Sequence, residues 1–368
     1  MESNRNGLLV CAGTSCVKNI GDYIQSVAQE QFYDSVDTYV EREAMDTFFS
    51  EDKTNVIMNA WFMWRPEHFP PSPSIRPLFI SMHIVPSVAD KMLSPEAVAY
   101  MKQYEPIGAR DLGTKNILEH YGVESYFSGC LTLTLGLKYK NEEKDGSVYF
   151  VDPYYELGGG KKFFKGYNYI RALFLLLKHY SHIKCLKKKF AYEFKSRLSE
   201  WSPTLDRMLY LASFYDTYSK AFDDDVLVSA HYIKHEVEQV QFHYDNDEKM
   251  EYARHLVRQY AKARLVVTSR IHCALPCLGV ETPVIFVTSD NLEKGAGRGG
   301  SNGRFSGLIE LLNQMEWTPK GVKVTTESLK RNLNGGKITK QSDVSNSREY
   351  KPICDSLITR VNDFLGRA

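Results

Sequence analysis

The chain has 368 residues, 43% of them hydrophobic, which is enough for two ordinary domains with separate cores. Lys and Arg number 46 against 45 Asp and Glu, and this balance argues against a nucleic-acid-binding protein. The longest strongly apolar run, residues 172–177, is far shorter than a membrane span, and the chain begins without a signal-peptide pattern. We therefore expect a soluble cytoplasmic protein whose seven cysteines are reduced thiols.

The first 157 residues alternate short apolar runs with helical patterns. An apolar run at residues 7–12 precedes a helical pattern that extends from Ile20 to Phe32. Strands that alternate with helices predict a parallel sheet covered on both faces. We therefore assign residues 1–157 to a first α/β domain, whose further strand signals lie at residues 55–61, 78–84, 106–109, 123–127 and 148–151.

Two charged residues of this domain stand where a strand is expected to end and a helix to begin. Asp22 follows Gly21 in the first expected helical turn, and Arg110 follows the run at residues 106–109. Asp22 is either a helix cap or a carboxylate that faces the cleft at the carboxyl ends of the strands. Arg110 either points into that cleft or pairs structurally with Asp111 or a backbone carbonyl.

Residues 158–222 form a strongly basic helical block. Between Lys161 and Lys195 the sequence has nine Lys and one Arg but only one acid, Glu193, and these charges alternate with Phe, Tyr and Leu. Such a segment suits contact with an anionic membrane surface or with a phosphate-bearing, lipid-linked acceptor. The alternative is a helical connector whose apolar stripe packs on the second domain while its lysines are solvated.

The second domain is assigned to residues 223–345. An apolar run at residues 226–230 predicts a strand, and His231 follows it directly. We expect His231 at the carboxyl end of this strand, where it would line the cleft, although most single histidines are structural. His235 and His243 have no such placement, and no histidine spacing in the chain predicts a metal site.

A strand, turn, helix and second strand follow one another in residues 263–287. Residues 265–267 and 283–287 are short apolar runs, and residues 271–278 have a helical pattern. The turn between them carries Ser269, Arg270 and His272. A turn of this kind collects free backbone N–H groups and the positive end of a helix, which favours an anionic ligand. Arg270 then supplies positive charge and His272 a proton-transfer group.

A glycine-rich segment with Arg298 and Arg304 follows at residues 288–307. Its composition predicts a mobile lid from which Arg304 reaches an anionic group, or else a disordered loop without function. Helices are expected at residues 306–315 and 326–332. Residues 346–368 are expected to form an amphipathic final helix that crosses back onto the first domain.

Three stretches together give the chain a resemblance to the polysaccharide pyruvyl transferase family. They are NIGDYIQS (residues 19–26), PIGARDLGTKNILEHYGVESYFSGCLTLTL (residues 106–135) and ARLVVTSRIHCALPCLGVETPVIFV (residues 263–287), with RFSGLIELL after them. They occur in the family's order and extend over most of the chain. Two positions depart from the family's pattern, Ala109 before the Arg-Asp pair and Cys273 after the histidine.

The resemblance implies a fold similar to the GT-B glycosyltransferases, in which two Rossmann-like domains with parallel sheets face each other across a cleft. It also implies transfer of pyruvate from phosphoenolpyruvate to two hydroxyls of one sugar, with neither a cofactor nor a metal. The acceptor is then a glycan or a lipid-linked oligosaccharide, and the enzyme acts in the cytoplasm or at the inner membrane face. The first 157 residues would hold the acceptor and residues 223–345 the donor.

The family's Ser-Arg-Leu-His motif assigns Arg270 to grip phosphoenolpyruvate and its leaving phosphate, with His272 as the proton-transfer group. Ser269, His231 and Arg304 are further donor-binding candidates, and Asp22 and Arg110 are cleft candidates on the acceptor side. Two other functions stay open. One is a nucleotide-sugar glycosyltransferase of the same architecture, and the other is a non-catalytic glycan- or lipid-binding component of a polysaccharide assembly complex.

Overall fold

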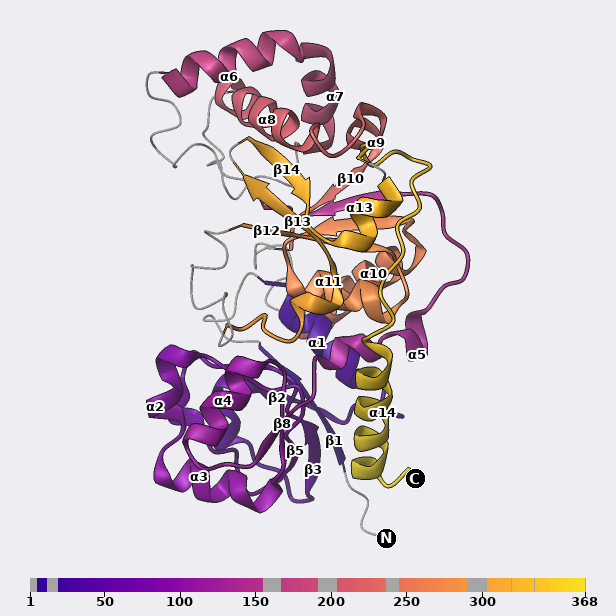
Figure 1. Cartoon of the computed structure of the whole chain (residues 1–368). Helices are drawn as coiled ribbons and strands as arrows, with labels where there is room; N and C mark the ends of the chain where they lie inside the picture. The colour runs from indigo at the N-terminus through magenta and orange to yellow at the C-terminus, as the bar shows by residue number, and fades with distance from the viewer. Residues whose placement is uncertain are drawn as a thin grey trace.

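The protein is an α/β structure with two sets of parallel strands and helices around both, as Figure 1 shows. The α/β class predicted from the sequence is therefore confirmed. The computed structural model describes residues 5–11, 19–154, 167–190, 204–235, 245–289, 303–318, 320–333 and 335–367. Within these ranges, no helix is long and apolar enough to cross a membrane.

The first part of the chain contains only parallel strand pairs in its described residues. Its strands are β1 (Arg5–Val10), β2 (Thr38–Glu41), β3 (Thr54–Ile57), β4 (Trp61–Phe62), β5 (Ile75–Leu78), β6 (His83–Ile84), β7 (Ile107–Ala109) and β8 (Ser125–Phe127). A four-stranded sheet has the order β2-β1-β3-β5, and β4 pairs with β6 and β7 with β8. The helices that follow β6 and β7 are α2 (Ala89–Met92), α3 (Pro95–Met101) and α4 (Leu112–His120).

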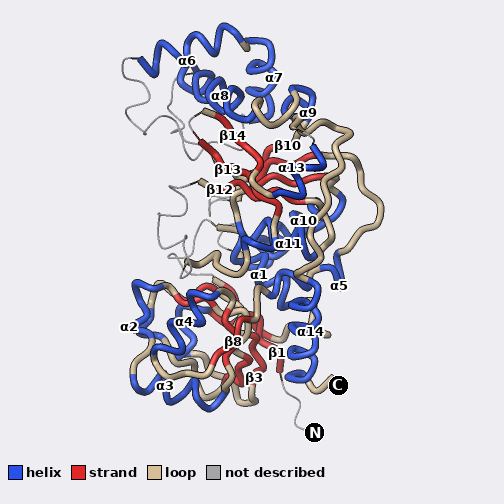
Figure 2. Tube along the Cα trace, in the orientation of Figure 1, coloured by secondary structure: helices blue, strands red, loops and turns tan. Residues whose placement is uncertain are grey.

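The second sheet has the strand order β10-β9-β11-β12-β13-β14, and only its last pair is antiparallel. Figure 2 shows this sheet as a second group of strands, separate from the first. The strands are β9 (Val148–Val151), β10 (His231–Ile233), β11 (Leu265–Thr268), β12 (Val284–Thr288), β13 (Asn313–Thr318) and β14 (Gly321–Val324).

Helices cover both faces of the second sheet, because its central strands are apolar on both sides. Leu265 and Val267 pack in the core formed with α6 (Tyr167–Lys178), α7 (Tyr180–Phe190), α8 (Thr204–Tyr218) and α9 (Asp224–Ser229). Val266 points to the other face, toward α1 (Gly21–Glu30), α10 (Asn246–Lys262) and α11 (Ile271–Gly279). Alternate residues of one fully buried strand thus serve two cores, as expected for a parallel sheet.

Helix α1 joins the two sheets. Leu8 and Val10 of β1 belong to the same continuous core as α1, α10 and α11, and α1 packs directly against α10. In Figure 1, α1 accordingly lies between the two groups of strands, next to α11. The beginning of α1 is therefore held against the beginning of α11, although 250 residues separate them in the sequence.

The final helix, α14 (Lys351–Leu365), lies beside the first sheet. Arg76 Nη1 donates to the carbonyl of Phe364 at 3.1 Å, and Arg367 Nη1 donates to the carbonyl of Phe32 at 2.7 Å. These two bonds fix the end of α14 to elements of the first part of the chain. Helix α13 (Glu327–Leu333) matches the helix predicted at residues 326–332.

Three predicted elements differ in the structure. Strand β9 was placed in the first domain, but it pairs with β10 and β11 in the second sheet. Residues 226–230 were predicted as a strand but lie mostly in α9, whose first turn carries Asp224 and Asp225, a favourable pattern at a helix start. Residues 306–315 do not form the predicted helix: they contain only a short 3-10 helix, η9 (Ile309–Leu311), and β13 begins at Asn313, where buried and half-buried residues alternate with a period of two.

The cysteines were expected to be reduced, and this is wrong for Cys11, which is disulfide-bonded. Among the described residues, the free cysteines are Cys130, Cys185, Cys273, Cys277 and Cys354.

Candidate functional site

The candidate site lies where the beginnings of α1, α4 and α11 meet. Each of these helices starts near the carboxyl end of a parallel strand, and Leu112 at the start of α4 donates its N–H to the carbonyl of Ser306 at 3.1 Å. The carboxyl ends of parallel strands are the usual position of ligand sites in such sheets. Two of the predicted residues, Arg110 and His272, are in direct contact here.

Gly21 brings the start of α1 against His272. A Cβ atom at Gly21 would lie 3.0 Å from the Cβ of His272 and 3.3 Å from its Nδ1. Both distances are shorter than an ordinary van der Waals contact. Glycine is therefore required at this position for close approach, and the backbone of α1 forms one wall around the imidazole.

Arg110 contacts the other side of the same imidazole. Its Nη1 lies 3.3 Å from Nε2 of His272, and both side chains are buried. A guanidinium can only donate, so Nε2 accepts and the single proton of the neutral ring is on Nδ1. Burial lowers the pKa of His272 well below its usual range, and the positive charges of Arg110 and Arg304 lower it further. His272 is therefore a neutral imidazole at physiological pH.

Asp111 and His83 support Arg110 from behind. Asp111 caps α4 by accepting from the N–H of Thr114 at 2.9 Å, and its other oxygen lies 2.7 Å from Nδ1 of His83 and 3.5 Å from Nε of Arg110. Although burial opposes ionisation, His83, Arg110 and Thr114 together hold the pKa of Asp111 below its usual value. Burial lowers the pKa of His83 to about 4. A buried carboxylate and a neutral imidazole thus fix the direction of the Arg110 side chain.

Asp22, in the first turn of α1, is mostly buried and has a perturbed carboxyl group. Burial raises its pKa, against the opposing effect of three guanidinium groups, those of Arg42, Arg110 and Arg304. Arg42 Nη1 lies 4.0 Å from the Asp22 carboxylate, and Gln25 donates to it at 3.3 Å. The pKa of Asp22 is raised while that of His272 is lowered, and such opposed shifts are typical of a general acid beside a general base.

A small cavity opens beside Asp22 at the carboxyl edge of the first sheet. Its volume is about 10 Å³, which is room for a single water molecule. Polar atoms from α1 and from the loop after β3 line it together with the end of β1. The lining residues are Leu9, Val10, Cys11, Asp22, Gln25, Ser26, Arg42, Asn59 and Ala60.

Ser269 and Arg270 lie at the predicted turn, but their side chains have structural partners. The Ser269 hydroxyl donates to the carbonyl of Val287 at 2.6 Å and accepts from the N–H of Tyr154 at 2.7 Å. Arg270 Nε donates to Asp152 at 2.9 Å, and the Arg270 side chain is about a quarter exposed. Arg270 therefore lies at the edge of the site, while Ser269 closes the turn.

His235, for which the sequence predicts no position in the cleft, connects three segments at this edge of the site. Its N–H donates to Asp152 at 3.0 Å, its carbonyl accepts from the N–H of Ile20 at 3.0 Å, and its Nε2 lies 2.7 Å from the hydroxyl of Tyr260. His235 thereby connects the end of β10 to the start of α1 and to the carboxylate that binds Arg270. The positions of Asp152 and His235, each just beyond the end of a parallel strand, were the signal for this role.

His231 was expected in the cleft, and this placement is wrong. It is the first residue of β10, is exposed, and stacks on Tyr149 with ring centroids 5.0 Å apart. Because β10 runs parallel to β9 and β11, His231 lies at the amino edge of the sheet, opposite the edge that carries His272.

Arg304 lies in a turn that reaches from the second sheet toward the start of α4. Its guanidinium is 4.9 Å from the ring centroid of Phe305, which packs on Phe286. The next glycine, Gly307, has a φ of +83° and lies against Phe127, so a Cβ atom there would clash. The positive charge of Arg304 acts on both Asp22 and His272. The lid predicted before Arg304 lies mostly outside the described residues.

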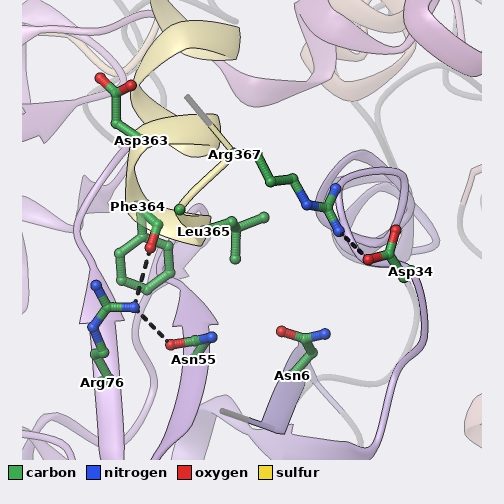
Figure 3. Close-up of a pocket in the computed structure, with 9 residues that line it drawn as sticks. Asn6, Asp34, Asn55, Arg76, Asp363, Phe364, Leu365 and Arg367 are labelled. Atoms are coloured by element: carbon green, nitrogen blue, oxygen red, sulfur yellow. Dashed lines mark hydrogen bonds and ion pairs between the residues drawn. The ribbon is translucent and has the colours of Figure 1, made fainter. Parts of the chain in front are cut away.

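A second cavity, of about 410 Å³, lies at the opposite edge of the first sheet. Figure 3 shows Asn6, Asn55 and Arg76 on one side of it and the end of α14 on the other. Arg76 Nη1 donates to Asn55 at 2.9 Å, and Arg367 is paired with Asp34 at 2.7 Å. Since these strand residues lie near the amino ends of β1, β3 and β5, this cavity is separate from the Arg110–His272 pair.

Among the described residues, no cluster of His, Cys, Asp or Glu has the arrangement of a metal site. The chain matches no curated protein and no solved structure. The family model for polysaccharide pyruvyl transferases matches residues 19–291. This range contains α1 with Asp22, the β7–α4 junction with Arg110 and the β11–α11 junction with His272. The match covers well over half of the chain, which therefore belongs to the polysaccharide pyruvyl transferase family.

Proposed function

We propose that this protein transfers a pyruvyl group from phosphoenolpyruvate to two hydroxyls of one sugar in the biosynthesis of a polysaccharide or other glycan. The sugar loses two O–H protons and its two oxygens bond to C2 of the donor, while the C2–O bond to phosphate and the C=C double bond of the donor break. One proton goes to the methylene carbon of the donor, which becomes the methyl group of a cyclic ketal, and the other leaves with inorganic phosphate. The contact between Arg110 and His272 within a member of this family is the observation that carries the proposal.

The donor has a carboxylate and a phosphate, so its site needs cationic groups. Arg110 is buried, and the positive charges of Arg110 and Arg304 both lower the pKa of Asp22 and of His272. Guanidinium groups bind both carboxylate and phosphate through paired hydrogen bonds. Arg270 adds a third cation at the edge of the site, where Asp152 fixes its position. We assign the donor to these three arginines, and we propose a GT-B-like arrangement in which the two parallel sheets hold donor and acceptor.

The reaction needs a base for the sugar hydroxyl and an acid for the methylene carbon of the donor. His272 is neutral because of its lowered pKa, but its Nε2 lone pair is occupied by Arg110. When a donor anion binds Arg110, that lone pair becomes available to accept the hydroxyl proton. Asp22 is the candidate acid, since burial raises its pKa and favours its protonated form. We assign the Asp22 carboxyl group, with the small cavity beside it, to the acceptor side.

The test is incubation with phosphoenolpyruvate and a panel of glycosyl acceptors, following phosphate release and the mass of the product. His272→Ala and Arg270→Ala should each reduce transfer about a hundredfold or more, the usual effect of losing a proton-transfer group or a charge clamp. Matched controls are His255→Ala and Arg258→Ala, which replace exposed residues of α10, and both should keep wild-type rates.

Three results would contradict the proposal. Wild-type transfer by the folded His272→Ala variant would move the proton-transfer group elsewhere. Turnover of a nucleotide sugar in place of phosphoenolpyruvate would indicate a glycosyltransferase. Binding of glycans without turnover of any donor would indicate a non-catalytic component of an assembly complex.

A further inference from the structure

Helix α6 presents an apolar stripe to solvent. Ile170, Phe174 and Leu177 are 68%, 64% and 75% exposed, and Tyr180 at the start of α7 is 53% exposed. Positions i, i+4 and i+7 lie on one face of a helix. These four are more than half of the large apolar side chains that are exposed in the described part of the chain. A contiguous patch of this kind marks an interaction surface, whereas single exposed apolar residues do not.

Helix α6 packs against the rest of the protein through a different face from this exposed stripe. The opposite face buries Ala172, Leu175 and Leu176 in a core shared with α8 and the second sheet. The helix therefore has one apolar face that packs and a second that faces water. A helix whose only role was to connect two elements would need the first face alone.

Cations border the exposed stripe. Arg171 and Lys178 are exposed on α6 beside it, and Lys184 is exposed on the neighbouring helix α7, with Lys187 half-buried. These residues belong to the segment that has ten basic residues and one acid in an otherwise slightly acidic chain. Among the described residues, Arg171 is the one of these four cations that forms an ion pair, through a 3.5 Å contact with Asp216. The helix pair thus combines exposed apolar side chains with excess positive charge.

We propose that α6 and α7 form a docking surface for an anionic lipid bilayer. Exposed Ile, Phe and Leu side chains insert at the level of the headgroups, and the neighbouring cations bind the acidic lipids. A protein partner would have to supply both an apolar groove and a row of acids, whereas an anionic membrane supplies both features everywhere on its surface. In Figure 1, α6 and α7 lie at the end of the molecule farthest from the first sheet, so a flat surface can reach them without contact with the other domain.

The experiment is sedimentation of the full-length protein with phosphatidylcholine vesicles, with and without phosphatidylglycerol. Wild-type protein should bind the anionic vesicles, bind the neutral vesicles much less, and dissociate as salt is raised. The Ile170→Ser, Phe174→Ser, Leu177→Ser triple variant should bind about a hundredfold more weakly, since three inserted side chains are lost. The Lys184→Glu, Lys187→Glu variant should bind at least about twenty-five-fold more weakly, because each of the two lost cations near an acidic membrane contributes roughly fivefold.

The matched control is Phe49→Ser with Leu137→Ser, which removes exposed apolar side chains elsewhere on the surface. It should bind like wild type, and both apolar-to-serine variants should keep the wild-type melting temperature because the replaced side chains are solvent-exposed. Wild-type protein that stays in the supernatant with anionic vesicles would overturn the proposal. So would a wild-type dimer, seen by sedimentation velocity, that the triple variant dissociates while vesicle binding is absent. Vesicle binding does not depend on catalysis, so its failure would leave the proposed reaction untouched.

Discussion

Replacing Gly21 by alanine tests the site without removing any of its chemical groups. The new Cβ would lie 3.0 Å from the Cβ of His272, 3.3 Å from its Nδ1 and 3.0 Å from Oδ1 of Asn19. Ordinary contacts of this kind are about 3.4–4 Å, so the imidazole must move by roughly 0.5 Å. Because Arg110 lies on the opposite side of the ring, this movement would disturb the 3.3 Å contact between Nη1 of Arg110 and Nε2 of His272. A 1 Å displacement of a reacting group costs about a hundredfold in rate, so we expect a loss of about tenfold.

The same substitution should have little effect on folding. Gly21 does not have a positive φ, so alanine can adopt its backbone conformation. Alanine also favours a helix over glycine by up to about 1 kcal/mol. Crowding against His272 and Asn19 opposes this gain by a similar amount. We therefore expect the free energy of unfolding, measured in urea, to change by no more than about 1 kcal/mol.

The assay is pyruvyl transfer with saturating phosphoenolpyruvate, together with NMR detection of the His272 ring. Gly336→Ala is the control, because its Cβ would also lie 3.0 Å from a neighbouring atom, the carbonyl of Leu333, far from the site. A Gly21→Ala variant that is folded, shows a displaced His272 signal and still turns over at the wild-type rate would refute the role of His272. An unchanged His272 signal would refute the packing on which the estimate depends.

Two further predictions concern titration. Arg110→Gln removes a positive charge that lowers the pKa of His272, so this pKa should rise. The acid limb of the kcat/KM profile should then move to higher pH, in parallel with the NMR titration of the His272 ring. An acid limb that stays in place would show that another group is the base. His83 has a pKa of about 4 when folded and about 6.5 when unfolded, so the stability that its neutral form contributes is present above pH 6.5 and is lost as pH falls toward 4, by about 3 kcal/mol. In urea titrations at pH 7 and pH 4.5, His83→Gln should lose correspondingly less stability than wild type, and an equal loss in both proteins would contradict the burial of a neutral imidazole.

The strand, turn and helix that carry His272 could be predicted because the relevant signals are local. Residues 265–267 are apolar and two of them are β-branched, and the structure has β11 at Leu265–Thr268 and α11 at Ile271–Gly279. The position of Arg110 after a short strand was predicted in the same way. Their contact was not predictable, since 162 residues separate them and the distance between them depends on how both sheets pack around α1.

The error at His231 shows where the local signal fails. The run at residues 226–230 is as apolar as a buried strand, but acidic residues precede it, and the structure forms α9 there. This shifts β10 to His231–Ile233, which moves His231 to the amino edge and brings His235 to the carboxyl edge. A strand boundary that is predicted a few residues too early therefore places His231, in place of His235, at the carboxyl edge of the sheet.

Strand β9 shows a second kind of limit. Its sequence, Val-Tyr-Phe-Val, identifies a buried strand, but a buried parallel strand fits the middle of either sheet equally well. Its membership in the second sheet is decided by pairing with β11, more than a hundred residues later. The assignment has a functional consequence, because Asp152 follows β9 and binds Arg270. The residue that fixes the edge cation thus comes from a segment that chain order had placed in the other domain.

The three short stretches that gave the family resemblance lie next to one another in space, and each contributes different residues to one site. The first contributes Gly21, which admits the imidazole, and Asp22, whose pKa burial raises. The second contributes Arg110, and the third contributes His272, whose pKa falls because it is buried beside that guanidinium. The raised carboxyl pKa costs folding free energy at neutral pH, which is unfavourable for a purely structural residue, and the lowered imidazole pKa keeps His272 neutral beside that carboxyl group. Their occurrence within one cluster of helix starts is therefore an argument for chemistry at this position that the sequence pattern alone does not supply.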